Sequence, residues 1–286
     1  MYNKYLILTL SFFSLIIILP FIGIFSKLNF DFYSLLVFIN NTYILKIIYF
    51  TFYQAFFSAV LSCLIAIPFA LALNRHKNLK IIRYLVSICG FSFVIPSILI
   101  VYAVIKLFGI NGFYNNYFNF YELFGINSIY GLKAILIAHI LLNAPFATRL
   151  FFQNLDNIPN KYYEISSSLN LTFFGNIIKL EIPIIKQNLF SVFSIIFSLC
   201  FLSFAIVMVL GGSPLNSTIE VAIYQFALFE LNFNKAIFLS FIQIFICSIF
   251  IFIGFNKMKG SKYFEINNNI YTHPYKNYKF IKLIDY

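Results

Sequence analysis

Long uncharged stretches alternate with short polar ones along most of this chain. A helix needs about 20 predominantly apolar residues to cross the hydrocarbon core of a bilayer. Six windows fit that requirement: 5–26, 47–73, 84–105, 134–152, 189–210 and 236–256. The fourth is the weakest, because its uncharged part is short and is flanked by Lys133 and Arg149, whose long side chains can snorkel to the interfaces. The pattern predicts an all-α integral membrane protein with six transmembrane helices.

Composition supports a membrane-embedded domain over 1–255, followed by a polar tail over 257–286. The chain is 61% hydrophobic and 10% charged, with a mean hydropathy of +0.88, far more apolar than a soluble domain. The first window follows Lys4 and superficially resembles a signal peptide. Its apolar run is too long for one, and no small-x-small cleavage site follows, so we expect it to remain as an anchor. For the tail, a poorly ordered terminus is favoured over contact with anionic lipid.

The net charge of +11 is distributed unevenly between the two predicted sides of the membrane. With the amino terminus placed in the cytoplasm, the outer side receives Lys27, Lys46, Lys106, Lys133 and Lys235, and the other 15 of the 20 Lys and Arg residues fall inside. Such asymmetry follows the positive-inside rule. The basic charge therefore indicates topology, with both termini cytoplasmic, and not nucleic-acid binding.

Several features carry no catalytic signal. The four cysteines, Cys63, Cys89, Cys200 and Cys247, lie inside predicted spans without metal-ligand spacing, so we expect no metal site and small buried side chains. The 40 Phe and 20 Tyr accompany abundant Asn, Ile and Lys, which indicates a genome rich in A/T codons more than an aromatic binding site. No segment resembles a P-loop, so ATP is not expected to bind by that device.

Polar groups inside spans are costly and mark candidate positions on a solute pathway. Gln54, His139, Asn143 and Gln243 are such groups, and Glu220 lies in the outer connection over 211–234, before the last span. Each of the four in the spans is more simply explained as a hydrogen bond between helices. For Glu220, contact with a cationic solute or with the delivering binding protein and a charge that complements the dipole at a helix start are equally good explanations. Asn143 with Pro145 predicts a kink in the fourth span. Because no inverted repeat or pair of broken helices stands out, a secondary transporter is disfavoured.

The predicted cytoplasmic loop over about 153–186 has a helix–turn–helix pattern. Asp156 and Asn157 are capping residue types, and Pro159 suits a first helical turn. A helical pattern then runs to Leu169, where Asn170 tolerates the left-handed conformation that ends helices. A second amphipathic stretch over 172–181 leads to Pro183 and the next span. The loop is thus a candidate for a short helix held at the membrane surface.

The same loop resembles the EAA motif of ABC importer permeases. Its register, E-x-small-small-x-L-N followed by I-P, places Glu164, Ser166, Ser167, Asn170 and Pro183 at the motif positions. The resemblance implies a coupling segment that grips a separate ABC ATPase subunit, with Glu164 offering a carboxylate to a basic group. Taken without the resemblance, an ordinary solvated loop with a capped helix remains open.

Other segments narrow the resemblance to the bacterial thiamine ABC transporter permeases. AHILLNAPFATRLFFQNLDNIP (138–159), LCFLSFAIVMVLGGSPLNSTIEVAIYQFAL (199–228) and YFTFYQAFFSAVLS (49–62) are similar to the first half of those proteins, and the similarity extends to about residue 255. It implies a type I, binding-protein-dependent permease fold. It also implies a subunit that moves thiamine or its phosphate esters across the inner membrane by alternating access, without a cofactor or catalytic activity of its own.

The expected partners are an ABC ATPase, a periplasmic solute-binding protein, the bilayer and a second permease unit. The last follows because thiamine permeases resemble two fused six-span units and this chain has one, which leaves a homodimer, a separately encoded half or a remnant open. Ile165, Ser166 and Asn170 stand where the motif usually has Ala-Ala and Gly, so docking to the ATPase is expected to be modified. Alternative functions are a permease for ferric iron, sulfate or another small solute, and a membrane assembly protein without a transport role.

Overall fold

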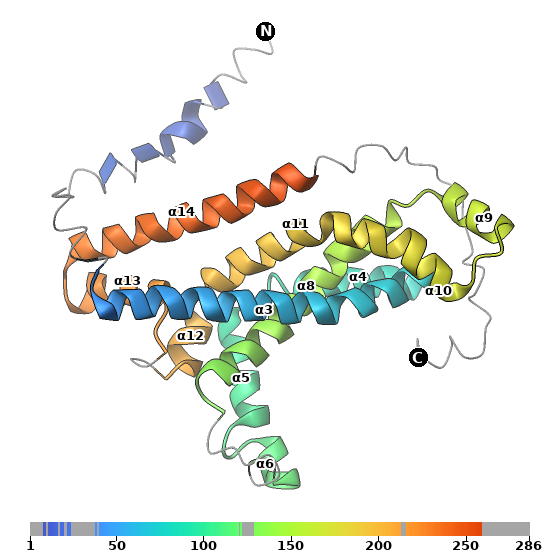
Figure 1. The fold of residues 1–286 in the computed structure, drawn as a ribbon. Coiled ribbons are helices and arrows are strands. Elements are labelled where there is room, and N and C mark those ends of the chain that lie inside the picture. The colour runs from blue at the N-terminus through green and yellow to red at the C-terminus, as the bar shows by residue number, and fades with distance from the viewer. Residues whose placement is uncertain are drawn as a thin grey trace.

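The computed structural model describes residues 8, 9, 11–16, 18, 19, 22, 23, 38, 40–119, 121, 129–212 and 216–258, and every regular element in that part of the chain is a helix (Figure 1). The elements with printed bounds are α3 (Thr42–Arg75), α4 (Lys80–Phe91), α5 (Ser97–Phe108), α6 (Phe113–Phe118), α8 (Leu132–Asp156), α9 (Asn160–Ser168), α10 (Phe173–Asn176), the π-helical η1 (Ile177–Glu181), α11 (Ile182–Phe201), α12 (Ala205–Leu210), α13 (Ile219–Tyr224), the π-helical η2 (Gln225–Phe229) and α14 (Phe233–Met258). The predicted all-α class is confirmed.

Five helical segments of the described chain are long and apolar enough to cross a membrane. They are Thr42–Arg75, Ser97–Phe118, Leu132–Asp156, Phe173–Phe201 and Phe233–Asn256. The remaining predicted span, 5–26, lies largely outside the described residues. The tail from 259 onward lies wholly outside them. Within the described part, four of the segments cover most of a predicted window, whereas Ser97–Phe118 overlaps only the second half of 84–105.

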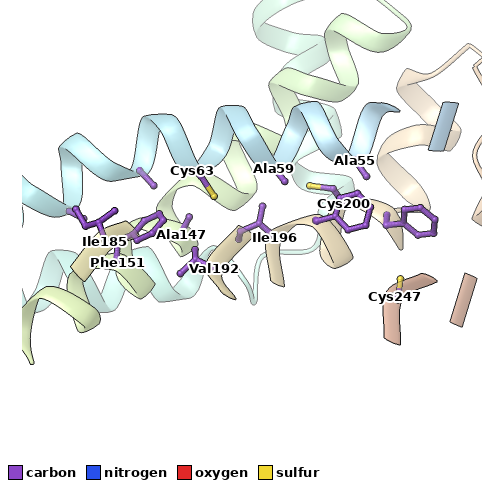
Figure 2. Packing of buried hydrophobic residues seen from close by; sticks show 14 of the residues in the cluster. Ala55, Ala59, Cys63, Ala147, Phe151, Ile185, Val192, Ile196, Cys200 and Cys247 are labelled. Atoms are coloured by element: carbon purple, nitrogen blue, oxygen red, sulfur yellow. The ribbon is translucent and has the colours of Figure 1, made fainter. Parts of the chain in front are cut away.

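Helix α3 forms the centre of the bundle, because its buried side is made of small residues. Ala55, Ala59, Cys63, Ala66 and Ala70 are buried at spacings of three or four, which lets neighbouring helices approach closely. Figure 2 shows Ala55, Ala59 and Cys63 facing α8 and α11, which contribute Ala147 and Ile196 to the same core. Helices α9 and α10 lie near one end of α3, and α12 and α13 near the other (Figure 1).

A second contact layer joins α11 to α14. Phe52 of α3, Phe197 of α11 and Phe250 of α14 meet there, with the rings of Phe197 and Phe250 stacked at a centroid distance of 4.2 Å. One turn further along α14, the Gly254 carbonyl accepts a hydrogen bond of 2.7 Å from the Ser191 hydroxyl of α11. The absence of a side chain at Gly254 permits this approach, since a Cβ there would lie 3.0 Å from the Ser194 Cβ.

Two of the predicted spans are interrupted, which corrects the expectation that no pair of broken helices exists. The window 84–105 breaks over 92–96, between α4 and α5, and 189–210 breaks over 202–204, between α11 and α12. Pro96 explains the first break, because it lacks an N–H and disfavours helical geometry at the preceding residue. The second break contains neither Pro nor Gly.

Candidate translocation cavity and coupling segment

The two helix breaks face one another across a cavity of about 400 Å³. Helix α8 supplies one wall, and the breaks and their flanking helix ends supply the rest. The lining residues are Phe93, Ile95, Ser97, His139, Leu142, Asn143, Phe146, Leu199, Leu202, Ser203, Phe204, Ala205 and Ile206. The volume lies within the range of small-molecule sites, which are mostly apolar with a few placed polar groups. The cavity is therefore the candidate solute site.

His139 and Asn143 are the polar side chains that α8 brings to this cavity. They are 1% and 4% exposed and lie one helical turn apart, so they share a face of α8. His139 Nδ1 is 2.9 Å from the Ser58 hydroxyl of α3, while its Nε2 has no hydrogen-bond partner among the described residues. Asn143 Nδ2 donates to the Cys200 sulfur at 3.2 Å. His139 thus lines the cavity while its buried Nε2 is unpaired among the described residues.

Aromatic rings form much of the remaining wall. Phe93 comes from the first break and stacks on Phe146 of α8, with ring centroids 5.4 Å apart. Phe204 comes from the second break and lies 5.0 Å from the Tyr224 ring. Flat apolar surfaces of this kind suit a planar solute, and ring faces also attract cations. The sequence does not single out these phenylalanines, because Phe is abundant throughout the chain and only Pro96 marks a break.

The other predicted pathway residues lie elsewhere and join helices. Gln54 is fully buried in α3 and its Nε2 donates to the Cys200 carbonyl at 3.0 Å. That carbonyl is at the end of α11, where the helix no longer supplies a complete set of donors. Gln243 of α14 donates to the Glu220 carboxylate of α13. The structure therefore brings His139 and Asn143 together at the cavity and places Gln54, Gln243 and Glu220 in contacts between helices.

Pro145 lies inside α8 without ending it, and the helix runs unbroken from Leu132 to Asp156. Among the described residues, no group of three or more His, Cys, Asp or Glu side chains could hold a metal ion. The four cysteines are free, and three of them are buried. The chemistry available at the cavity is hydrogen bonding and aromatic contact.

The predicted coupling loop contains the expected short helix, α9. It begins after Pro159, and Asp156 instead ends α8, where its carboxylate pairs with Lys77 at 3.0 Å. The helix ends in a Schellman motif: the Leu171 N–H donates to the Ser166 carbonyl, and the Asn170 N–H to the Ser167 carbonyl. Asn170 has a φ of 50°, in the left-handed region. Asn170 thus ends the helix as predicted.

The motif residues are divided between the two faces of this segment. Glu164, Ser167, Asn170 and Pro183 are exposed. Ser166 is buried and its hydroxyl donates to the Tyr163 carbonyl at 2.8 Å, so it does not present its side chain to a partner. Ile165 and Leu169 are exposed as well, 56% and 67%, beside Glu164. The outward face therefore combines one carboxylate with apolar surface.

Comparison with known proteins relates this chain to transport permeases. No protein-family model matches it. It is 35% identical over 210 residues to the thiamine transport system permease protein ThiP of Haemophilus influenzae, and 33% identical over 211 residues to that of Escherichia coli. Each match covers 73% of this chain and 39% of the relative. The chain thus spans about two fifths of the length of these relatives, in roughly their first half.

A solved structure gives the same fold. A chain of a bacterial alginate ABC transporter, crystallised in complex with its alginate pentasaccharide-bound periplasmic protein, superposes with a TM-score of 0.70. The superposition covers 93% of this chain and 96% of that one at 14% sequence identity, which supports the fold and nothing finer. The chain is thus similar to the thiamine-transport permeases over roughly the first half of their length, and its fold is that of an ABC importer permease.

Proposed function

We propose that this chain is a permease subunit of a binding-protein-dependent ABC importer in the bacterial inner membrane, and that its solute is thiamine or a thiamine phosphate ester. The solute assignment is supported by the relatives named above, which are thiamine permeases. The transport assignment is carried by one observation, the cavity between two interrupted helices. Interrupted helices at such a site are a recurring device of transporters, since freed backbone groups and polar side chains can meet a solute there.

The cavity lining is chemically suited to thiamine. The solute has two flat heteroaromatic rings, one of them cationic. The stacked Phe93 and Phe146 offer ring faces to it, at about 0.5–2 kcal/mol for a cation over a ring. His139 Nε2 and the Asn143 amide offer hydrogen bonds. In this proposal the halves of the broken helices move against each other, so that the cavity opens to one side of the membrane and then to the other.

Energy for this movement comes from a separate ATPase that binds α9 on the cytoplasmic side. Glu164 and the neighbouring apolar surface of Ile165 and Leu169 form its docking face. A carboxylate at the centre of such a face pairs well with an Arg or Lys, because charge-assisted hydrogen bonds are stronger than neutral ones. A periplasmic solute-binding protein delivers the solute to the outer end, near α13.

The decisive experiment reconstitutes the complete importer in liposomes and measures ATP hydrolysis and uptake with different loaded binding proteins. Thiamine-loaded protein is expected to stimulate ATP hydrolysis and drive uptake. Stimulation by iron-loaded or sulfate-loaded protein instead would overturn the solute assignment. Uptake that proceeds without ATP would show a secondary transporter, and no uptake of any solute would leave the assembly role as the better explanation.

A further inference from the structure

One carboxylate at the predicted cytoplasmic end is buried, which is unusual for an acidic residue. Glu181 has an exposed fraction of 0% and is the one acidic side chain among the buried described residues. It ends η1, immediately before α11. Burying a carboxylate is expensive unless hydrogen bonds or opposite charges offset the lost hydration. The sequence does not predict that Glu181 is buried, because the pattern over 172–181 is that of an amphipathic helix with one exposed face.

The partners of Glu181 come from two other elements. The Tyr163 hydroxyl of α9 donates to Glu181 Oε1 at 3.3 Å, and Asn74 Nδ2, in the last turn of α3, donates to the Tyr163 oxygen at 3.2 Å. Tyr163 and Asn74 are themselves buried. Arg75 and Lys77, on the same end of α3, add positive charge that acts on the carboxylate. A chain of hydrogen bonds therefore joins α3, α9 and the start of α11.

Tyr163 is the main attachment of α9 to the membrane helices. Its side chain and that of Ser166 are the only buried ones in α9, and the Ser166 hydroxyl bonds within its own helix. The neighbouring Glu164 and Ile165 are exposed and point away from the bundle. One face of α9 is thus exposed to a partner, while Tyr163, its one large buried side chain, faces the bundle.

The end of α3 holds the rest of the loop as well. The Arg75 guanidinium lies over the Phe173 ring of α10, 5.0 Å from its centroid, and Lys77 pairs with Asp156 at the end of α8. These contacts lie nearer the surface than the Tyr163 hydroxyl. Together they fix the loop to α3, whereas the Tyr163–Glu181 bond connects it to α11.

Both helices run without interruption from this cluster to the cavity. Along α3, the helix carries Asn74 and also Ser58, which bonds His139 of the cavity wall. Along α11, the helix starts after Glu181 and reaches Cys200, which bonds Gln54 and Asn143. A displacement of α9 that is passed to Glu181 and Asn74 thus reaches the cavity wall on two continuous helices.

We propose that Tyr163, Glu181 and Asn74 form a joint that transmits movement of α9 to α3 and α11. These are positioning residues: they touch neither solute nor nucleotide, and they act by keeping α9 in register with the two helices. The proposal rests on the proposed function, because it needs an ATPase that moves α9. It predicts that loss of the joint separates ATP hydrolysis from transport without preventing assembly.

The test substitutes Tyr163→Phe in the complete importer and measures uptake and ATP hydrolysis in the same liposomes. The ring stays and only the hydroxyl is lost, so assembly should be retained. Uptake per ATP hydrolysed should fall about fivefold or more, since hydrogen bonds to charged groups are among the stronger ones. Tyr117→Phe, at a tyrosine that is 73% exposed in α6, is the matched control and should leave the ratio unchanged.

A second pair of variants tests the acceptor. Glu181→Gln keeps an oxygen for the Tyr163 hydroxyl and should retain most of the coupling, whereas Glu181→Ala should lose it. Because the two groups act as one unit, Tyr163→Phe combined with Glu181→Ala should be little worse than Glu181→Ala alone.

Three results overturn the joint. They are an unchanged ratio in Tyr163→Phe, a fall in uptake and hydrolysis in equal proportion, and a loss that only reflects less assembled complex. Failure of the proposed function would give a different result, because the unsubstituted complex would then show no ATP-dependent uptake. Stimulated hydrolysis in the unsubstituted complex, with a reduced ratio in Tyr163→Phe, supports both.

Discussion

At the scale of single residues, Asn170 shows how a departure from the usual motif retains its geometry. Glycine is common where a helix ends in a left-handed residue, because it has no Cβ to clash. Asn170 occupies that conformation with a φ of 50° and lets Leu171 and its own N–H bond the last carbonyls of α9. Asparagine is the residue most tolerant of this geometry after glycine. The outward face around Glu164 therefore keeps its shape.

Substitution of Asn170 by Val should weaken binding of the ATPase. A β-branched residue in the left-handed region costs about 1–2 kcal/mol, which frays the end of α9 and disorders the docking face. Asn170→Gly should leave binding unchanged. Co-purification of the ATPase in detergent measures both, and equal recovery with Val and Gly would contradict the argument.

At the scale of elements, hydropathy predicts where helices cross the membrane but not where they break. The predicted windows 47–73, 134–152 and 236–256 lie within α3, α8 and α14, each of which is one unbroken helix. The break at 92–96 had a usable signal in Pro96, whereas that at 202–204 had none, since Leu202, Ser203 and Phe204 are ordinary helix residues. Because one of the two breaks carries no sequence signal, the sequence does not predict the cavity between them. It does mark His139 and Asn143 as polar groups within a span.

The contact between α11 and α14 depends on Gly254. Gly254→Leu should destabilise the protein by about 1–3 kcal/mol, because the added side chain meets Ser194 and displaces the bond from Ser191. Thermal unfolding in detergent, followed by size exclusion, should show a lower midpoint than for Phe252→Leu, a lipid-facing change on the same helix. A midpoint equal to that of the Phe252→Leu control would contradict the prediction, because it would show that a side chain at position 254 does not weaken the contact between α11 and α14.

At the scale of the whole molecule, an exposed apolar stripe is consistent with the second permease unit that the sequence leads us to expect. Ile81, Tyr84, Ile88 and Phe91 of α4 recur at helical spacing and are each more than 60% exposed. Lipid covers such a surface adequately, but a permease that encloses a pathway needs a facing unit. A two-fold dimer is the usual arrangement for assemblies of one chain.

Mass measurement of the importer in mild detergent tests this arrangement. Two copies of this chain with the ATPase are expected. One copy beside a different permease chain would refute the homodimer and favour a separately encoded half. The sequence could not decide between these, because the windows that predict spans carry no information about which surface meets lipid and which meets protein.

The small-residue stripe of α3 has a consequence for how this protein evolves. Ten of the chain's 14 alanines are buried, most of them where helices touch, while phenylalanine is far more abundant, with 40 copies. Alanine codons are rich in G and C, so a mutational drift toward A and T tends to remove them. Selection against helix separation would oppose that drift at these positions and leave the lipid-facing ones to follow it. The buried alanines should therefore be replaced more slowly than the rest of the chain, and they are the positions at which distant relatives are best aligned.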